Sequence, residues 1–243
     1  MLRYIWLEAK RQWRNREILI FRLGIPAAIY LILIAAQDEP PRASGELPWA
    51  TGRMVALVAL AAVMSGLASG PSLGEERGNG WLRQLRVTPL RPSAAVVAKI
   101  VVAMSFALPA IAVVAAIGGV TADITLSAGR WVQVIGLMWV ATASVAAVGT
   151  LIGLTFGAES AQNATTLAFV VLWLLGGIFT PVSQMPDVLA AVGRSLPSHG
   201  IVAVGDSVAL GTVIPGSAIA VLAAWTAAAG SLAVLAWRRV MSR

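Results

Sequence analysis

The chain has 243 residues, of which 58% are hydrophobic and only 12% are charged, and its formal net charge is +7. Soluble domains carry about 25% charged residues, so this composition indicates an integral membrane protein rather than a soluble domain. The positive charge is more typical of arginines kept on the cytoplasmic side of a membrane than of nucleic-acid binding. The absence of cysteine excludes disulfides, iron–sulfur clusters and thiol catalysis.

Residues 1–17 are predicted to form an amphipathic helix in the membrane interface. Their apolar side chains recur at helical spacing, at Leu2, Ile5, Trp6, Ala9 and Trp13. Most of the basic residues lie off that face, so the tryptophans would lie at headgroup depth and the arginines toward anionic lipid. The alternative is a plain basic flank before the first span. The segment lacks the short apolar core of a cleavable signal peptide.

Six apolar stretches of about the length that crosses a bilayer follow. They cover residues 18–36, 49–73, 94–118, 131–156, 164–179 and 216–237. Glycines at four-residue spacing occur in the second stretch, at Gly66 and Gly70, and in the fourth, at Gly149 and Gly153; such spacing allows close helix–helix contact. We expect a polar turn at residues 157–163, and the fold class is therefore all-α, with six transmembrane helices.

Residues 180–215 contain four prolines that separate short apolar pieces. No piece reaches the length of a span. We therefore expect short re-entrant helices on the outer side, because backbone that does not span is tolerated where protein or a polar cavity covers it.

The distribution of lysine and arginine predicts that both termini are cytoplasmic. With the N-terminus inside, the outer side holds only Arg42, Arg53, Arg130 and Arg194 of the 18 basic residues. The connection at Glu159 is the weak point, because it carries no positive charge.

Several kinds of chemistry are missing from the sequence. No Asp or Glu is expected in the middle of a span, where ion-driven transporters usually need one. There is no cluster of residues at metal-ligand spacing, and the single histidine, His199, is expected to be a polar surface residue. No Gly-x-x-x-x-Gly-Lys-[Ser/Thr] motif is present, so energy for uphill transport would have to come from another subunit.

Residues 75–92 form a dense charged segment between two apolar stretches. Trp81, Leu82 and Leu85 would make a small apolar stripe on a short helix, bordered by Arg83 and Arg86. An aromatic residue with an arginine border suits a protein–protein contact. A helix lying on lipid headgroups is the alternative, and the pattern alone does not decide between them.

The same segment resembles the membrane subunits of type-2 ABC transporters, which include the daunorubicin-resistance-type drug exporters and the polysaccharide exporters. Those permeases carry a cytoplasmic stretch of the form Glu-Arg-Glu-x-Gly-Thr-Leu-Glu-x-Leu-x-Val-Thr-Pro-Leu after the second span. The matching positions are Glu76, Arg77, Gly80, Leu82, Leu85, Val87, Thr88, Pro89 and Leu90. Lys99 matches a lysine that the family often places early in the third span.

A second motif, Gly176-Gly177-Ile178-Phe179-Thr180-Pro181 followed by Met185-Pro186 and Leu196-Pro197, is similar to the run that the family folds into re-entrant outer helices. The chain departs from the family at Gly78 and Arg83, where acidic residues are usual. Gly78 and Gly80 flank Asn79, so a helix is expected to weaken there.

The resemblance implies a dimer of membrane subunits in the cell membrane that works with two cytoplasmic ATPases. ATP and Mg would bind those partners, and this chain would hold no cofactor and no metal and would not be an enzyme. The residues expected to contact the ATPase are Glu76, Arg77, Gly80, Trp81, Leu82, Arg83, Leu85, Arg86, Thr88 and Pro89. The outer motif is expected to be carried by Gly177, Phe179, Pro181, Pro186 and Pro197.

The substrate path would follow the second and fifth spans. The candidate residues are Ser65, Ser69, Thr165, Thr166, Phe169 and Trp173, with ordinary helix packing as the alternative for each. An apolar path with scattered hydroxyls and aromatic rings suits export of a hydrophobic or amphipathic drug, antibiotic, lipid-like molecule or peptide. Two other classes stay open: a membrane-embedded enzyme, which would need a polar cluster at one depth, and a membrane anchor or sensor that transports nothing.

Overall fold

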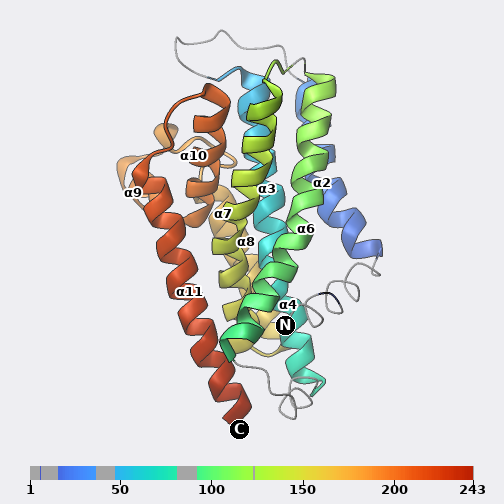
Figure 1. The fold of residues 1–243 in the computed structure, drawn as a ribbon, viewed down its shortest axis with the longest axis vertical. Helices are drawn as coiled ribbons and strands as arrows, with labels where there is room; N and C mark the ends of the chain where they lie inside the picture. Colours follow the sequence, from blue (N-terminus) through green and yellow to red (C-terminus); the bar gives the residue numbers. More distant parts are fainter. Residues whose placement is uncertain (1–5, 7–15, 37–46, 81–91, 123, 243) are drawn as a thin grey trace.

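Long helices that run side by side along one axis make up the molecule (Figure 1). The structure is a computed structural model that describes residues 6, 16–36, 47–80, 92–122 and 124–242. Apart from residues 6, 16 and 17, the predicted interfacial helix lies outside the described residues. Among the described residues, all regular structure is helical and there is no strand.

The helices follow the predicted apolar stretches in order. They are α2 (Arg16–Ala36), α3 (Trp49–Leu67), α4 (Ser69–Gly78), α6 (Pro92–Thr121), α7 (Ala128–Thr155), α8 (Ala158–Leu175), α9 (Asp187–Arg194), α10 (Pro197–Leu210) and α11 (Gly216–Ser242), with a short 3-10 turn at Val182–Gln184.

Four helical stretches of the described chain are long and apolar enough to cross a membrane. They are Trp49–Gly78, Pro92–Thr121, Ala128–Thr155 and Gly216–Met241, and α9 with α10, bent by 83°, could make a fifth. The protein is thus a multi-pass membrane protein with four to five candidate spans. Helix α8 is not apolar enough to count as a candidate span, because its first turns carry Glu159, Gln162 and Asn163. In α2, only the shorter stretch Gly24–Ala36 counts as apolar. The predicted number of six stays a prediction.

The predicted polar turn at residues 157–163 is wrong for most of its length. Only Gly157 stays outside the helix, and α8 begins at Ala158. Glu159 lies in the first turn of α8, where a negative side chain interacts favourably with the exposed backbone N–H groups. The polar residues therefore begin a helix instead of interrupting one.

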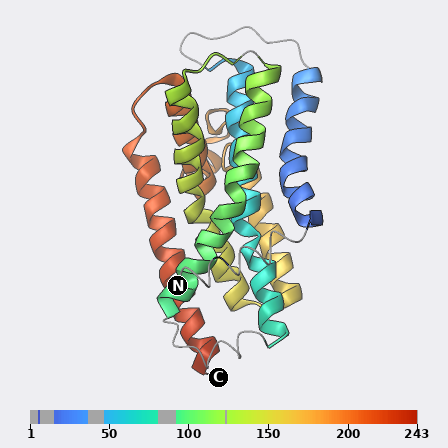
Figure 2. The same cartoon turned by 45° about the vertical axis from the view of Figure 1, so that its right-hand side comes forward.

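Helix α3 forms the centre of the bundle. Its side chains from Met54 to Val63 are all buried, because α2, α6, α7 and α10 pack around it. Helices α2 and α11 lie at opposite edges in both views (Figures 1 and 2). A helix that is apolar on every side and enclosed by others supplies the rigid axis of the fold.

Helices α3 and α4 form one nearly continuous rod whose glycines face α7 and α8. A Cβ atom on Gly66 would lie 3.0 Å from the backbone nitrogen of Ala146, and one on Gly153 would lie 2.5 Å from the carbonyl oxygen of Gly70. The glycine spacing in the sequence predicted close contact, and the structure confirms it by bringing the two sets of glycines against each other.

Lower in the bundle, the ends of α4, α7 and α11 meet the starts of α6 and α8 (Figure 1). A small apolar cluster joins the ends of α4, α7 and α11 to the start of α6. It contains Leu73, Ala95, Val96, Leu154, Ala233 and Trp237. We call this part of the molecule the α4 end.

We expect Gly153→Ala to lower the stability of the protein, because the new methyl group would press on the backbone of α4. Overpacking of this kind costs about 1–3 kcal/mol. Gly136→Ala, on the same helix with open space at its Cβ position, is the matched control and should be neutral or slightly stabilising. Thermal unfolding of both variants in detergent checks this; equal melting temperatures would refute the close contact.

Candidate functional site

A buried ion pair joins α4 to α6. The Lys99 ammonium donates to both carboxylate oxygens of Glu76, with Nζ–Oε1 and Nζ–Oε2 distances of 2.9 and 2.7 Å. Only 3% of the Lys99 side chain and 5% of the Glu76 side chain are exposed. Buried charges persist in proteins only when they are paired and hydrogen-bonded, so each residue here makes the burial of the other possible.

The next residue, Arg77, fastens α4 to α7. Its Nη1 atom donates to the carbonyl oxygens of Leu154, at 2.9 Å, and Thr155, at 3.0 Å. These carbonyls belong to the last turn of α7, which has no intrahelical donors for them. A cation at this end also suits the negative end of the helix dipole. Two consecutive charged residues therefore tie α4 to two different helices.

Helix α4 ends where the sequence predicted weakness. Gly78 is its last residue, Asn79 is the C-cap and Gly80 has φ of +70°, a left-handed conformation that glycine adopts without strain. Of the residues expected to contact an ATPase, Glu76, Arg77 and Gly80 are described. Trp81, Leu82, Arg83, Leu85, Arg86, Thr88 and Pro89 lie outside the described residues.

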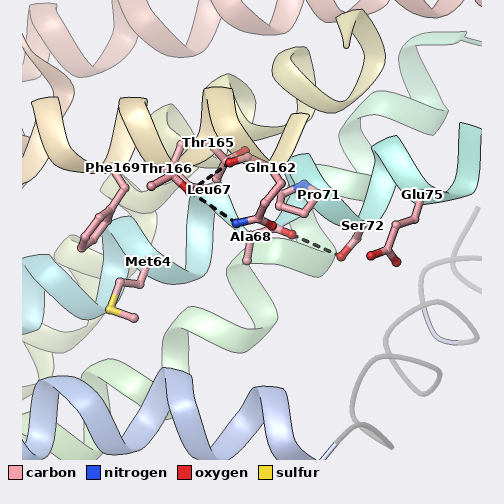
Figure 3. Close-up of a pocket in the computed structure, with 10 residues that line it drawn as sticks. All are labelled: Met64, Leu67, Ala68, Pro71, Ser72, Glu75, Gln162, Thr165, Thr166 and Phe169. Carbon is pink, nitrogen blue, oxygen red and sulfur yellow. Dashed lines mark hydrogen bonds between the residues drawn. The ribbon is translucent and has the colours of Figure 1, made fainter. Parts of the chain in front are cut away.

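A cavity of about 440 Å³ lies between the α3–α4 rod and α8 (Figure 3). One wall comes from α3 and α4 and the other from α8. The lining residues are Met64, Leu67, Ala68, Pro71, Ser72, Glu75, Gln162, Thr165, Thr166 and Phe169. The surface is mainly apolar, with an amide, three hydroxyls and one carboxylate, and it therefore suits an amphipathic molecule.

Three of the predicted substrate-path residues line this cavity: Thr165, Thr166 and Phe169. The Thr165 hydroxyl is buried against Gly70 and has no hydrogen-bond partner among the described residues. Thr166 donates to the Gln162 carbonyl and accepts a bond from the Gln162 amide. Gln162 and Thr166 thus offer polar groups to the cavity from successive turns of α8.

Ser65 and Ser69 are not among the residues that line the cavity. The Ser69 hydroxyl bonds to the carbonyl of Gly66 and to that of Ala146 on α7, at 3.1 and 3.4 Å, and the Ser65 side chain is fully buried. Both lie on the rod that carries the small residues packed against α7. The Ser69 hydroxyl therefore takes part in the contact between the α3–α4 rod and α7.

Aromatic rings lead from the cavity toward the outer motif. Phe169 and Trp173 stack with ring centroids 6.3 Å apart, and Trp173 meets Phe179 edge to face at 5.1 Å. The backbone N–H of Phe179 donates to the carbonyl of Trp173, and the side chain of Arg53 donates to the carbonyl of Phe179. Trp173 therefore connects the cavity wall to the residues after α8.

The prolines and glycines of the outer motif have distinct structural tasks. Pro181 and Pro186 are the N-caps of the 3-10 turn and of α9, and Pro197 is the first residue of α10, a position that suits proline. Gly177 has φ of +85°. The predicted short helices are present, whereas their re-entrant position in a membrane stays a prediction.

His199 is only partly a surface residue. Its ring is partly exposed, but its Nδ1 atom is buried without a partner among the described residues. The described residues hold no group of three His, Asp or Glu side chains suited to a metal ion.

Two features of the site were missed from the sequence. The Glu76–Lys99 pair was missed because the two residues were matched to the family separately. Gln162 was missed because it was placed in a turn; with α8 beginning at Ala158, positions 162, 165, 166 and 169 fall on one helical face, and this spacing could have identified it.

Comparison with known proteins supports one family. Residues 2–203 match the family model described as ABC-2 type transporter. The chain is also similar to a Bacillus subtilis (strain 168) protein named "Putative transport permease YvfS", with 28% identity over 196 residues, which cover 79% of this chain and 78% of the relative.

We expect Glu76→Gln and Lys99→Met each to destabilise the protein by about 3–5 kcal/mol, because each removes one charge from a buried, hydrogen-bonded ion pair. The double variant should recover a large part of that loss. A double-mutant cycle on thermal unfolding in detergent measures the coupling. Additive losses would show that the two charges do not stabilise each other.

Proposed function

Since this chain belongs to the ABC-2 type transporter family, we propose that it is the permease subunit of an ATP-driven exporter for a hydrophobic or amphipathic molecule. The membrane domain of this family lacks the ATPase site of the partner subunit, and ABC-2 permeases generally pair with ABC ATPase subunits. Drugs, antibiotics, lipid-like molecules and peptides fall within the proposed substrate class.

The proposal rests mainly on the position of the cavity, which lies beside the α3–α4 rod. The end of this rod leads into the proposed ATPase-coupling segment, residues 75–92. The same helix lines the cavity through Pro71, Ser72 and Glu75. Its next two residues, Glu76 and Arg77, bond to α6 and α7. A push on the segment after Gly80 would therefore move the cavity wall relative to α8 and change access to the cavity.

The lining supports an amphipathic substrate. Met64, Leu67 and Phe169 provide apolar surface, and Gln162 and Thr166 provide hydrogen-bonding groups. Glu75 contributes the single carboxylate among the lining residues. Apolar walls with a few placed polar groups are the usual composition of small-molecule sites.

We further propose that the α4 end faces the cytoplasm, together with both termini. Arg77, Lys99, Arg238 and Arg239 belong to this end, whereas Arg130 lies in the first turn of α7 at the opposite end. The excess of basic residues at the α4 end agrees with the positive-inside rule.

A dimer is part of the proposal. Helix α8 has few buried positions and exposes Leu167, Val170, Val171 and Leu174. A second permease protomer packed on this face would cover these apolar side chains. No specific observation favours a membrane-embedded enzyme or a sensor instead.

The class of function is tested by reconstituting the chain in lipid with an ABC ATPase expressed alongside it. We expect the ATPase to co-purify with the permease and its ATP hydrolysis to rise in the complex. An ATPase that neither binds the permease nor responds to it would contradict the proposal.

Gln162→Leu should weaken stimulation of ATP hydrolysis by a substrate, because it removes an amide from the cavity. Loss of one hydrogen bond of about 1 kcal/mol corresponds to roughly a fivefold higher half-maximal concentration. Gln133→Leu is the matched control, since Gln133 is exposed on α7 and is not among the residues lining the cavity. An equal shift of the half-maximal substrate concentration in both variants would show that the cavity is not part of the substrate path.

The proposed orientation is testable because the chain has no cysteine. We expect Asn79→Cys to be protected from a membrane-impermeant maleimide in intact cells and labelled after permeabilisation. Val213→Cys, at a 91% exposed position on the proposed outer side, should be labelled in both conditions. The reverse pattern would invert the topology.

A further inference from the structure

A second groove lies at the α4 end, between the end of α7 and the last turns of α11. Its volume is about 540 Å³, and it shares no lining residue with the first cavity. Arg77 and Arg239 are the charged residues that line it, and no acidic residue is among the lining residues. Two basic side chains therefore line the same groove.

Arg77 is held in a fixed position at this groove. Both of its bonds to the α7 carbonyls come from Nη1, one nitrogen of a group that has five N–H donors in a planar arrangement. A guanidinium held in this way is suited to phosphate, whose oxygens accept its hydrogen bonds in a defined geometry.

Apolar side chains also line the groove. Leu232 and Leu235 line it from α11 and are 52% and 50% exposed, and Phe156 lines it from the end of α7 and is 43% exposed. Positions 232, 235 and 239 fall on one face of α11. The leucines therefore lie on the same helix face as Arg239 and up to two turns further from the end of the bundle.

We propose that this groove binds an anionic diacyl phospholipid of the adjacent leaflet. The phosphate would lie between Arg77 and Arg239, and an acyl chain would lie along Phe156, Leu232 and Leu235. Basic pockets between membrane helices at the cytoplasmic side recognise anionic headgroups in this way. Free phosphate would use only half of the site, because it has nothing to place on the apolar wall.

Lipid binding at this groove would affect the candidate functional site, because the two share Arg77. Arg77 adjoins Glu76, which pairs with Lys99, and it also holds the last turn of α7. A phosphate on Arg77 would strengthen the attachment of α4 to α7, so the lipid would stabilise the α4 end.

Native mass spectrometry of the full chain in detergent tests the proposal. The probes are phosphatidylglycerol and phosphatidylcholine with identical acyl chains. Both lipids carry the phosphate, but phosphatidylcholine adds a positively charged choline that the two arginines would repel. We therefore expect phosphatidylglycerol to bind about fivefold more tightly and Arg239→Gln to remove that preference, because one arginine near an anionic lipid headgroup corresponds to about this factor. Arg239 is preferred to Arg77 for substitution because Arg77 also caps α7.

Arg238→Gln is the matched control, because Arg238 is the adjacent exposed arginine of α11 and is not among the lining residues. It should keep the preference, and Leu235→Ser should weaken binding of both lipids. Equal binding of the two lipids, or equal loss in the Arg238 and Arg239 variants, would overturn the proposal. Displacement of the lipid by millimolar inorganic phosphate would show that the groove is a simple anion site, and this result would also overturn the proposal.

Discussion

A carboxylate and an ammonium buried side by side hold the α4 end together. Removing two charges from water is expensive, and the cost is recovered only when the partners meet in good geometry. Glu76 and Lys99 meet at 2.7 Å, which fixes both the rotation of α4 and its height against α6. Arg77, one residue later, then reaches the last carbonyls of α7. The attachment of α4 to both neighbours follows from this arrangement.

The rod formed by α3 and α4 uses its faces for different purposes. Gly66, Gly70 and Gly74 bring α7 and α8 close, and neighbouring side chains line the cavity opposite α8. At its end the rod leads into the segment that we propose contacts the ATPase. A displacement of that segment would be carried to the cavity by a stiff helix, since little of the rod can deform without breaking buried contacts.

The sequence predicted features that depend on local patterns. Apolar length predicted the stretches that became α3, α6, α7 and α11, the spacing of Gly149 and Gly153 predicted close packing, and Asn79 between two glycines predicted where α4 ends. Features that depend on how helices are rotated against each other were missed. Glu76 and Lys99 are 23 residues apart, and no pattern in either segment says that their side chains face each other. The hydroxyl of Ser69, a predicted substrate-path residue, bonds to the Ala146 carbonyl of α7, a contact that no local pattern shows, and its place on the path stays a prediction.

In the proposed function, a push on the segment after Gly80 reaches the cavity wall through α4, which the Glu76–Lys99 pair holds against α6. The direct measurement is the number of substrate molecules exported per ATP hydrolysed by the reconstituted complex, with Lys99→Met compared with the unaltered chain. We expect the ATPase to stay bound and to hydrolyse ATP while export per ATP falls. An unchanged ratio of export to hydrolysis, in a variant that is folded and bound to the ATPase, would contradict this expectation.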